Sequence, residues 1–425
     1  MLASIIAAFR LPDLRKRILF VFGMFAVFVV GLHIPVPGID RVAMEKLFEQ
    51  GTLLGLMDVF SGGALRKFTI FAMGIAPYIN ASIIMQLLTV AIPSLEALAK
   101  EGEHGRKKIS QYTRYLTIAL AALQAVGMNT ILQRADVLQA TPFLKIQIVI
   151  TLTAGTAFLM WVGEQITDKG IGNGVSIVIF TGIVASLPWQ FYRTIEYTVG
   201  GAYKPHQLML AALLFLGTVV GIVAIQQAQR KIPIQHVKRV VGTKIYGGTS
   251  SFLPLRVNSA GVIPIIFALS IQLFPATLAN FIPEGSWLAP VGNLAKALSP
   301  GASLWAAALY AAFIIFFTYF YTAVTFNVPE VADNLKKYGS FIPGIRPGKP
   351  TLEYLDRVMS RITLAGAIFL AIIALMQYWA PWITKVETFG LVGGTSLLIV
   401  VGVALETMQA IEAHLLMRHY EGFIK

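Results

Sequence analysis

Long apolar stretches separated by short polar segments follow one another along the chain. Each stretch has the length that an α-helix needs to cross a hydrocarbon core of roughly 30 Å. The stretches are residues 18–34, 69–92, 114–132, 143–163, 174–192, 207–228, 257–282, 303–326, 361–382 and 390–411. This pattern predicts an all-α polytopic membrane protein with ten transmembrane helices.

The distribution of positive charge predicts the orientation of these helices. An even number of spans places both termini on one side of the membrane. If that side is the cytoplasm, 24 of the 34 Lys and Arg residues fall in segments on the inside and 10 on the outside. This asymmetry follows the positive-inside rule and accounts for the net charge of +13 without a nucleic-acid partner. We therefore expect a multi-pass protein of the bacterial plasma (inner) membrane with both termini cytoplasmic.

Two halves with an odd number of spans each must enter the membrane in opposite senses. The pattern thus predicts an N-terminal half at residues 1–192 and an inverted C-terminal half at residues 193–425. Residues 1–12 resemble a short interfacial helix. The segment after the first span, residues 31–38, has no small-x-small cleavage site, so we interpret the first span as an uncleaved anchor.

Composition narrows the possible functions. Of the residues, 56% are hydrophobic and 13% are charged, which is too little polar surface for a soluble globule of this length. The predicted span centres are nearly free of the ionisable residues that ion-coupled transporters require. Cysteine is absent, the Gly348-Lys349 pair lacks the upstream glycine of a P-loop, and the six His residues show no metal-ligand spacing. We expect no enzyme activity, no catalytic residue, no metal and no cofactor; a secondary transporter of a small or lipid-like solute and an intramembrane enzyme are the alternatives.

One apolar segment is too short to cross a bilayer. Residues 51–65, GTLLGLMDVFSGGAL, lie between the first two spans and end in a serine and two glycines. Backbone of this kind at membrane depth requires surrounding protein or a water-filled cavity, so the segment indicates a re-entrant piece inside a funnel. An interfacial helix outside the hydrocarbon core fits the hydropathy equally well.

Branched aliphatic pairs at helical spacing recur in three spans. They are Ile75 with Ile79, Val175 with Ile179, and Val262 with Ile266. Such pairs face a pore, a packed core or lipid, and the spacing does not decide between them. The second and seventh spans also contain glycine and proline, at Gly74 and Pro77 and at Gly261, Pro264 and Pro275, which predicts helices that can bend.

Two long inside segments, residues 229–256 and 327–360, are rich in basic residues. The first alternates apolar and basic residues and contains Gly247 and Gly248, which predicts a small hairpin in the cytosol. Such loops either set topology only or form a docking surface for an acidic partner.

Six segments in chain order resemble the SecY family, the channel subunits of the general secretory translocon. The resemblance covers nearly the whole chain. The segments are FSGGALRKFTIFAMGIAPYI (60–79), KEGEHGRKKISQYTRY (100–115), GEQITDKGIGNGVSI (163–177), NSAGVIPIIFA (258–268), FIPGIRPGKPT (341–351) and GGTSLLIVVGVALE (393–406).

The resemblance implies a protein-conducting channel in which two five-helix halves surround a central hourglass pore. Unfolded secretory polypeptides would cross the membrane through the pore, and membrane segments would leave sideways into lipid. Residues 53–64 would form a plug, carried by Leu53, Leu54, Leu56, Met57, Phe60, Ser61, Gly62 and Gly63. A ring of aliphatic side chains would close the waist, formed by Ile75, Ile79, Val175, Ile179, Ile266 and Ile399.

The resemblance also implies a lateral gate and several partners. The gate would lie between the second and seventh spans at Pro77, Asn80, Gln86, Pro264 and Gln272. The expected partners are the small membrane subunits SecE and SecG, the SecA ATPase, the ribosome, the signal sequences of substrate proteins and membrane lipid. SecA or the ribosome would dock on Lys238, Arg239, Arg256 and Arg346.

Overall fold

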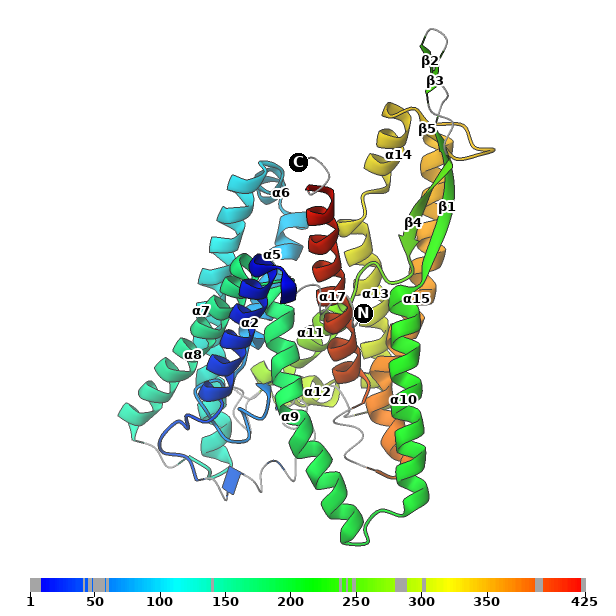
Figure 1. Ribbon diagram of the computed structural model, residues 1–425. Coiled ribbons are helices and arrows are strands. Elements are labelled where there is room, and N and C mark those ends of the chain that lie inside the picture. The colour runs from blue at the N-terminus through cyan, green and yellow to red at the C-terminus, as the bar shows by residue number, and fades with distance from the viewer. Residues whose placement is uncertain are drawn as a thin grey trace.

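The chain folds into a bundle of long α-helices with a β-hairpin at one end (Figure 1). This computed structural model describes residues 9–40, 43–44, 48, 58, 61–138, 141–236, 239–241, 244–246, 250–279, 289–299, 303–386 and 393–421. The predicted interfacial helix at residues 1–12 therefore lies mostly outside the described residues.

The described helices follow the predicted spans closely. They are α2 (Pro12–Gly31), α5 (Ala76–Ala91), α6 (Pro93–Lys100), α7 (Glu103–Arg134), α8 (Pro142–Lys169), α9 (Gly174–Val199), α10 (Pro205–Gln227), α11 (Ile263–Ala279), α12 (Ala289–Ala297), α13 (Leu304–Thr325), α14 (Val328–Lys337), α15 (Lys349–Thr384) and α17 (Thr395–Glu421). Asn173, Ser303 and Asn327 each accept a backbone N–H from the first turn of the helix that follows, and so fix where α9, α13 and α14 begin.

Among the described residues, seven helices are long and apolar enough to cross a membrane. The pair α5 and α6, bent by 100° at Ile92, raises this number to eight. The predicted first and seventh spans, α2 and α11, are a helix of 20 residues that begins with three basic residues and an apolar helix of 17 residues. The protein is thus a helical multi-span structure, and the count of ten remains a prediction.

The second and seventh spans begin later than hydropathy predicted. Residues 62–75 form consecutive turns, with Phe68 and Gly74 at φ of 44° and 56°, and α5 starts only at Ala76. Gly261 has φ of 65° and α11 starts only at Ile263. The prediction that Gly74 and Gly261 lie within helices and let them bend was wrong, because both adopt the left-handed backbone that ends regular structure.

The predicted hairpin is confirmed. Strand β1 (Gln229–His236) pairs antiparallel with β4 (Ser250–Arg256), with Gln229 opposite Arg256 and Gln235 opposite Ser250. A second ribbon, β2 (Arg239–Val241) with β3 (Lys244–Tyr246), forms the tip, and β5 (Ser340–Phe341) adds to the free edge of β1. Ile232 and Leu255 at the base of the hairpin are buried against α15, which fixes the hairpin on the bundle.

The two ends of the bundle carry different segments. The hairpin, α6, α14 and the C-terminal end of α17 lie at one end, which is the top in Figure 1. The connections from α7 to α8 and from α9 to α10 lie at the opposite end. This separation matches the predicted alternation of inside and outside segments, so we refer to the hairpin end as the inner end.

The largest buried apolar cluster lies where helices of both predicted halves meet. It joins Phe28, Ile75, Leu159 and Ile183 of the first half to Ile222, Ile314 and Leu398 of the second. A second cluster, built around Phe68, Leu132 and Leu152, packs the non-helical residues before α5 against α7 and α8.

We expect Gly155→Ala to destabilise the protein. Gly155 of α8 lies against the backbone of the non-helical segment, and an added Cβ would overlap the carbonyl oxygen of Ile70. Because rigid backbone cannot move aside as a side chain can, we expect a loss of about 1–3 kcal/mol, measured by thermal unfolding in detergent. Gly217→Ala on α10 is the matched control, since no atom lies within 4 Å of its added Cβ. Equal midpoints for the two variants would contradict this account of the packing.

Candidate functional site

All six aliphatic residues predicted for the ring lie in the largest buried cluster. Ile75, Ile179, Ile266 and Ile399 are buried, and Ile79 and Val175 are partly buried against them. They come from α9, α11, α17 and the start of α5, four segments spread over most of the sequence. The structure therefore brings the six residues together in the protein interior and does not place them on the outer surface of the bundle.

The six residues share one position in their helices, the N-terminal end. Ile75 precedes the first residue of α5 and Ile79 is the fourth; Ile266 is the fourth residue of α11, and Ile399 the fifth of α17. A glycine with positive φ lies one or two residues before each of the four helices: Gly74, Gly172, Gly261 and Gly394. The points at which these helices begin thus determine where the aliphatic side chains meet.

The chemistry of these side chains is that of a barrier. Branched aliphatic groups offer neither ligands nor hydrogen bonds to ions or water, so a narrow ring of them dewets. Methyl and methylene groups can still rearrange around an extended chain, because they hold one another only by dispersion forces. Such an arrangement can close to small solutes and open to a polypeptide without any covalent step.

The C-terminal part of the predicted plug is anchored on α9. The hydroxyl of Ser61 donates to the Asp58 carbonyl at 3.0 Å and accepts the Leu65 N–H at 3.1 Å, while the Asp58 carboxylate accepts the Arg66 N–H at 2.8 Å. A Cβ added at Gly62 would lie 2.9 Å from the backbone of Gly182, one turn beyond Ile179. Leu53, Leu54, Leu56, Met57 and Phe60 lie outside the described residues.

The residues predicted for the lateral gate occupy different environments. Helices α5 and α11 contact each other, and Pro77 and Pro264 are the second residue of each. Asn80 and Gln86 are half-buried on α5. The buried amide of Gln272 donates to the carbonyls of Leu298 and Ala306 at 2.9 and 2.8 Å, so it fastens α11 to the start of α13.

Basic residues predicted to bind a partner lie on and near the hairpin. Arg256 is the last residue of β4 and is exposed. The carbonyl of Arg346 accepts the hydroxyl of Thr351 at 2.8 Å, which ties its turn to the start of α15. Arg239 begins β2, and Lys238 lies outside the described residues.

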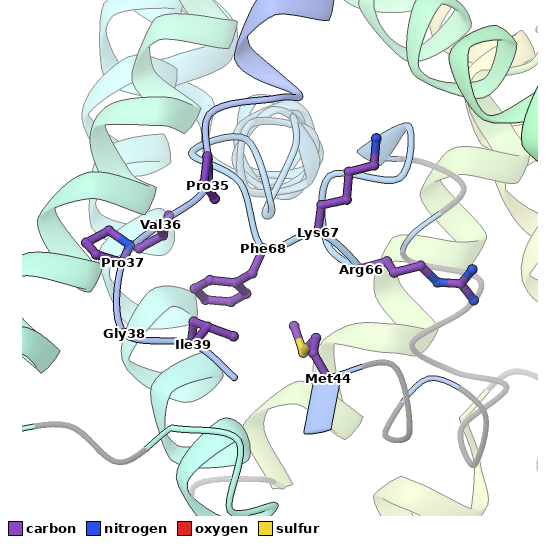
Figure 2. Close-up of a pocket in the computed structure, with 9 residues that line it drawn as sticks. All are labelled: Pro35, Val36, Pro37, Gly38, Ile39, Met44, Arg66, Lys67 and Phe68. Atoms are coloured by element: carbon purple, nitrogen blue, oxygen red, sulfur yellow. The ribbon is translucent and has the colours of Figure 1, made fainter. Parts of the chain in front are cut away.

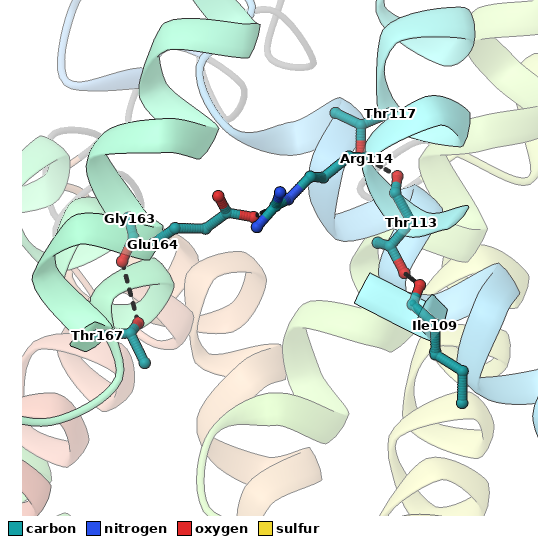
Figure 3. A network of polar contacts seen from close by, with 7 residues as sticks. All are labelled: Ile109, Thr113, Arg114, Thr117, Gly163, Glu164 and Thr167. Carbon is teal, nitrogen blue, oxygen red and sulfur yellow. Dashed lines mark hydrogen bonds and ion pairs between the residues drawn. The ribbon is translucent and has the colours of Figure 1, made fainter. Parts of the chain in front are cut away.

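An ion pair that the sequence did not predict links α7 and α8 near the inner end of the bundle. Arg114 Nε donates to Glu164 Oε1 at 2.7 Å, with side chains 49% and 21% exposed (Figure 3). The hydroxyls of Thr113 and Thr117 donate to carbonyls one turn earlier, so they leave the pair to bridge the two helices alone. The partners are fifty residues apart, and no local pattern in the sequence indicates the pairing.

A cavity of about 180 Å³ lies beside the residues that follow the plug (Figure 2). Its lining includes Pro35, Ile39 and Met44, and Phe68 points toward Ile39, whereas Arg66 and Lys67 extend away from that ring. Within the described part of the chain, no group of three His, Asp or Glu side chains could hold a metal ion.

Comparison with known proteins decides the family. The model of the SecY family matches residues 69–408. The chain belongs to the SecY family. A relative from Streptomyces scabiei, named protein translocase subunit SecY, is 46% identical over 441 residues, and the alignment covers 100% of both chains.

Solved structures of the SecY family share the fold. One, from work entitled to the plug domain of SecY and its seal of the closed channel, has a TM-score of 0.65 at 19% identity and covers 94% of this chain and 92% of its own. Another, Sec61 in a canine ribosome-channel complex, has a TM-score of 0.63 at 17% identity with the same coverage. These comparisons confirm the predicted SecY fold class and a multi-pass membrane protein, and the relative's name agrees with the expectation of a translocase subunit and not an enzyme.

The Arg114–Glu164 pair should contribute little to stability. Because both side chains keep contact with solvent, a double-mutant cycle of Arg114→Gln and Glu164→Gln should give a coupling free energy of at most about 1 kcal/mol. The measurement is thermal unfolding of the single and double variants in detergent at low and high salt. The coupling should fall as salt rises; a coupling independent of salt would show that the pair is not a screened ion pair.

Proposed function

We propose that this chain is the channel-forming subunit of a protein translocase and that a polypeptide crosses the membrane between the six aliphatic side chains. The observation that carries the proposal is their placement: residues from four segments meet in one buried cluster, at the start of four helices. Family membership and the name of the Streptomyces relative support the same function.

The plug and the gate follow from this proposal. The segment 53–64 would cover the constriction, and its end at Gly62 lies against α9 within one turn of Ile179. The halves 1–192 and 193–425 would part between α5 and α11, whose contact lies beside the constriction. Hydrophobic segments would enter lipid through this opening, as apolar surface prefers acyl chains to water. The related structure titled for its plug supports a sealing role for the segment.

Orientation and partners are further parts of the proposal. We place the hairpin end and both termini in the cytoplasm of a cell whose plasma membrane holds the chain, because 24 of the 34 basic residues then lie inside. The inside segments would receive SecA and the ribosome, and SecE and SecG would complete the complex. The canine relative, a ribosome-channel complex by its title, supports the ribosome as a partner.

A solute transporter is the alternative function. The names of the relatives give it no support. The aliphatic cluster also lacks the ionisable groups that would couple transport to an ion gradient.

The constriction can be tested by crosslinking. The chain has no cysteine, so Ile79→Cys and Ile179→Cys each give a single reactive site. We expect both to form disulfides with a secretory precursor that carries one cysteine and is stalled by a folded C-terminal domain. Val220→Cys, 68% exposed on the outer surface of α10, is the control and should give no crosslink. If both isoleucine variants gave no crosslink while stalling was intact, the ring would be refuted.

The docking of a motor can be tested by reversing one charge. Arg346→Glu should reduce SecA-driven export by about tenfold or more, because a basic contact becomes a repulsive one at an acidic surface. Thermal unfolding should be unchanged, since the backbone carbonyl of Arg346, and not its side chain, makes the hydrogen bond to Thr351. Arg357→Glu, an exposed charge on α15, is the matched control. Equal export by the two variants would remove Arg346 from the docking surface.

A further inference from the structure

A polar cleft of about 270 Å³ lies at the inner end of the bundle, beside the base of the hairpin. The ends of five helices and the residues before α11 enclose it. Its lining consists of Asn173, Gln226, Arg256, Asn258, Ser259, Ala260, Gly261, Ile263, Tyr321, Thr325, Leu405, Glu406 and Gln409. The ring, the plug and the gate as described above do not use the carboxylate or the amides of this lining.

The cleft contains one carboxylate, which is open to solvent. Glu406 of α17 is exposed, and its Oε1 lies 2.8 Å from where a Cβ at Gly261 would be, so the carboxylate rests on the backbone that leads into α11. Arg256 lines the same cleft, but no ion pair joins it to Glu406 among the described side chains. The carboxylate thus has acceptor capacity for another cation.

Two buried amide atoms of the lining lack a hydrogen-bond partner. Asn258 is only 4% exposed; its Nδ2 donates to the Gly261 carbonyl at 2.9 Å, and its Oδ1 has no partner among the described residues. The same holds for Nε2 of Gln226. An unpaired buried amide costs free energy. A guest that supplied a donor to Asn258 and an acceptor to Gln226 would recover it.

The cleft lies on the path to the constriction. Asn173, which caps α9, is two residues before Val175, and Glu406 is seven residues beyond Ile399 on α17. At 1.5 Å per residue, seven helical residues span about 10 Å. A group held at Glu406 would therefore lie roughly 10 Å to the inner side of the aliphatic ring.

We propose that this cleft is a subsite for a basic side chain, lysine or arginine, of the polypeptide that enters the channel. The inference rests on the proposed function. An ammonium or guanidinium group brings several N–H donors and no acceptor, which suits Glu406 and the Oδ1 of Asn258. A backbone carbonyl of the same guest suits Nε2 of Gln226. An anionic guest would be repelled by Glu406.

The surrounding charge makes this site selective. Most basic residues of the chain lie in the segments assigned to the inner side, so a basic residue of a substrate meets like charge over much of that surface. Glu406 offers it a favourable position in the mouth of the channel. The cleft would hold the positive flank of an entering segment on the inner side while the apolar part that follows reaches the ring.

The test uses crosslinking from Thr325, an exposed residue of the cleft. Thr325→Cys is combined with wild-type Glu406, Glu406→Gln or Glu406→Asp in the full translocase in membrane vesicles. Stalled precursors carry one cysteine two residues from a test position that is Lys, Arg or Gln. With Glu406 and with Glu406→Asp, the Lys and Arg precursors should crosslink about fivefold more than the Gln precursor. With Glu406→Gln the ratio should fall to about one.

Two controls separate this inference from the proposed function. Glu412→Gln, on the same helix and outside the cleft, should keep the fivefold preference. Ile179→Cys reports whether precursors reach the constriction at all, and its failure would refute the channel itself. If Ile179→Cys crosslinks normally while the preference at Thr325→Cys is absent, or survives in Glu406→Gln, the cleft holds only water and the subsite is refuted.

Discussion

The structure depends on one constraint: backbone at membrane depth must find its hydrogen-bond partners within the protein. Fourteen residues before α5, from Gly62 to Ile75, are not helical and face this requirement. They meet it with their own turns and with the segment after α2, since Ile70 N–H donates to the Ile34 carbonyl at 3.1 Å and Val36 N–H to the Phe68 carbonyl at 2.9 Å. The absence of a side chain at Gly155 lets α8 approach this segment closely enough to cover it.

This irregular backbone makes a constriction possible. A continuous helix from residue 69 would carry Ile75 and Ile79 along its middle and would leave no room beside them for the end of the plug. Because the helix begins at Ala76, both residues lie at its tip, where they meet the first turns of α9, α11 and α17. Short helix starts converging from different segments leave a narrow contact region, whereas full-length helices packed side by side would fill the interior.

The sequence predicted the apolar spans well, because hydropathy reports directly which segments leave water. It failed at the start of the second and seventh spans, because the residues before Ala76 and Ile263 are as apolar as those after them and only the positive φ of Gly74 and Gly261 separates the two. The ring residues could be named only through the resemblance, since their spacing fits lipid-facing positions equally well. The Arg114–Glu164 pair and the cleft around Glu406 bring together residues far apart in the chain, which no local pattern encodes.

The constriction and the inner cleft divide two tasks that one site could not perform. A barrier that admits chains of any sequence must not bind particular side chains, and an aliphatic ring satisfies this because it offers only dispersion contacts. Discrimination among chains then has to occur where charges remain solvated and can exchange partners, which requires a polar, open surface. Glu406 is exposed and unpaired with Arg256 in the described structure, so a cation can reach it and leave it without the desolvation cost that a buried carboxylate would impose. The distance of roughly two helical turns between Ile399 and Glu406 keeps this charge outside the seal, where it does not hydrate the ring.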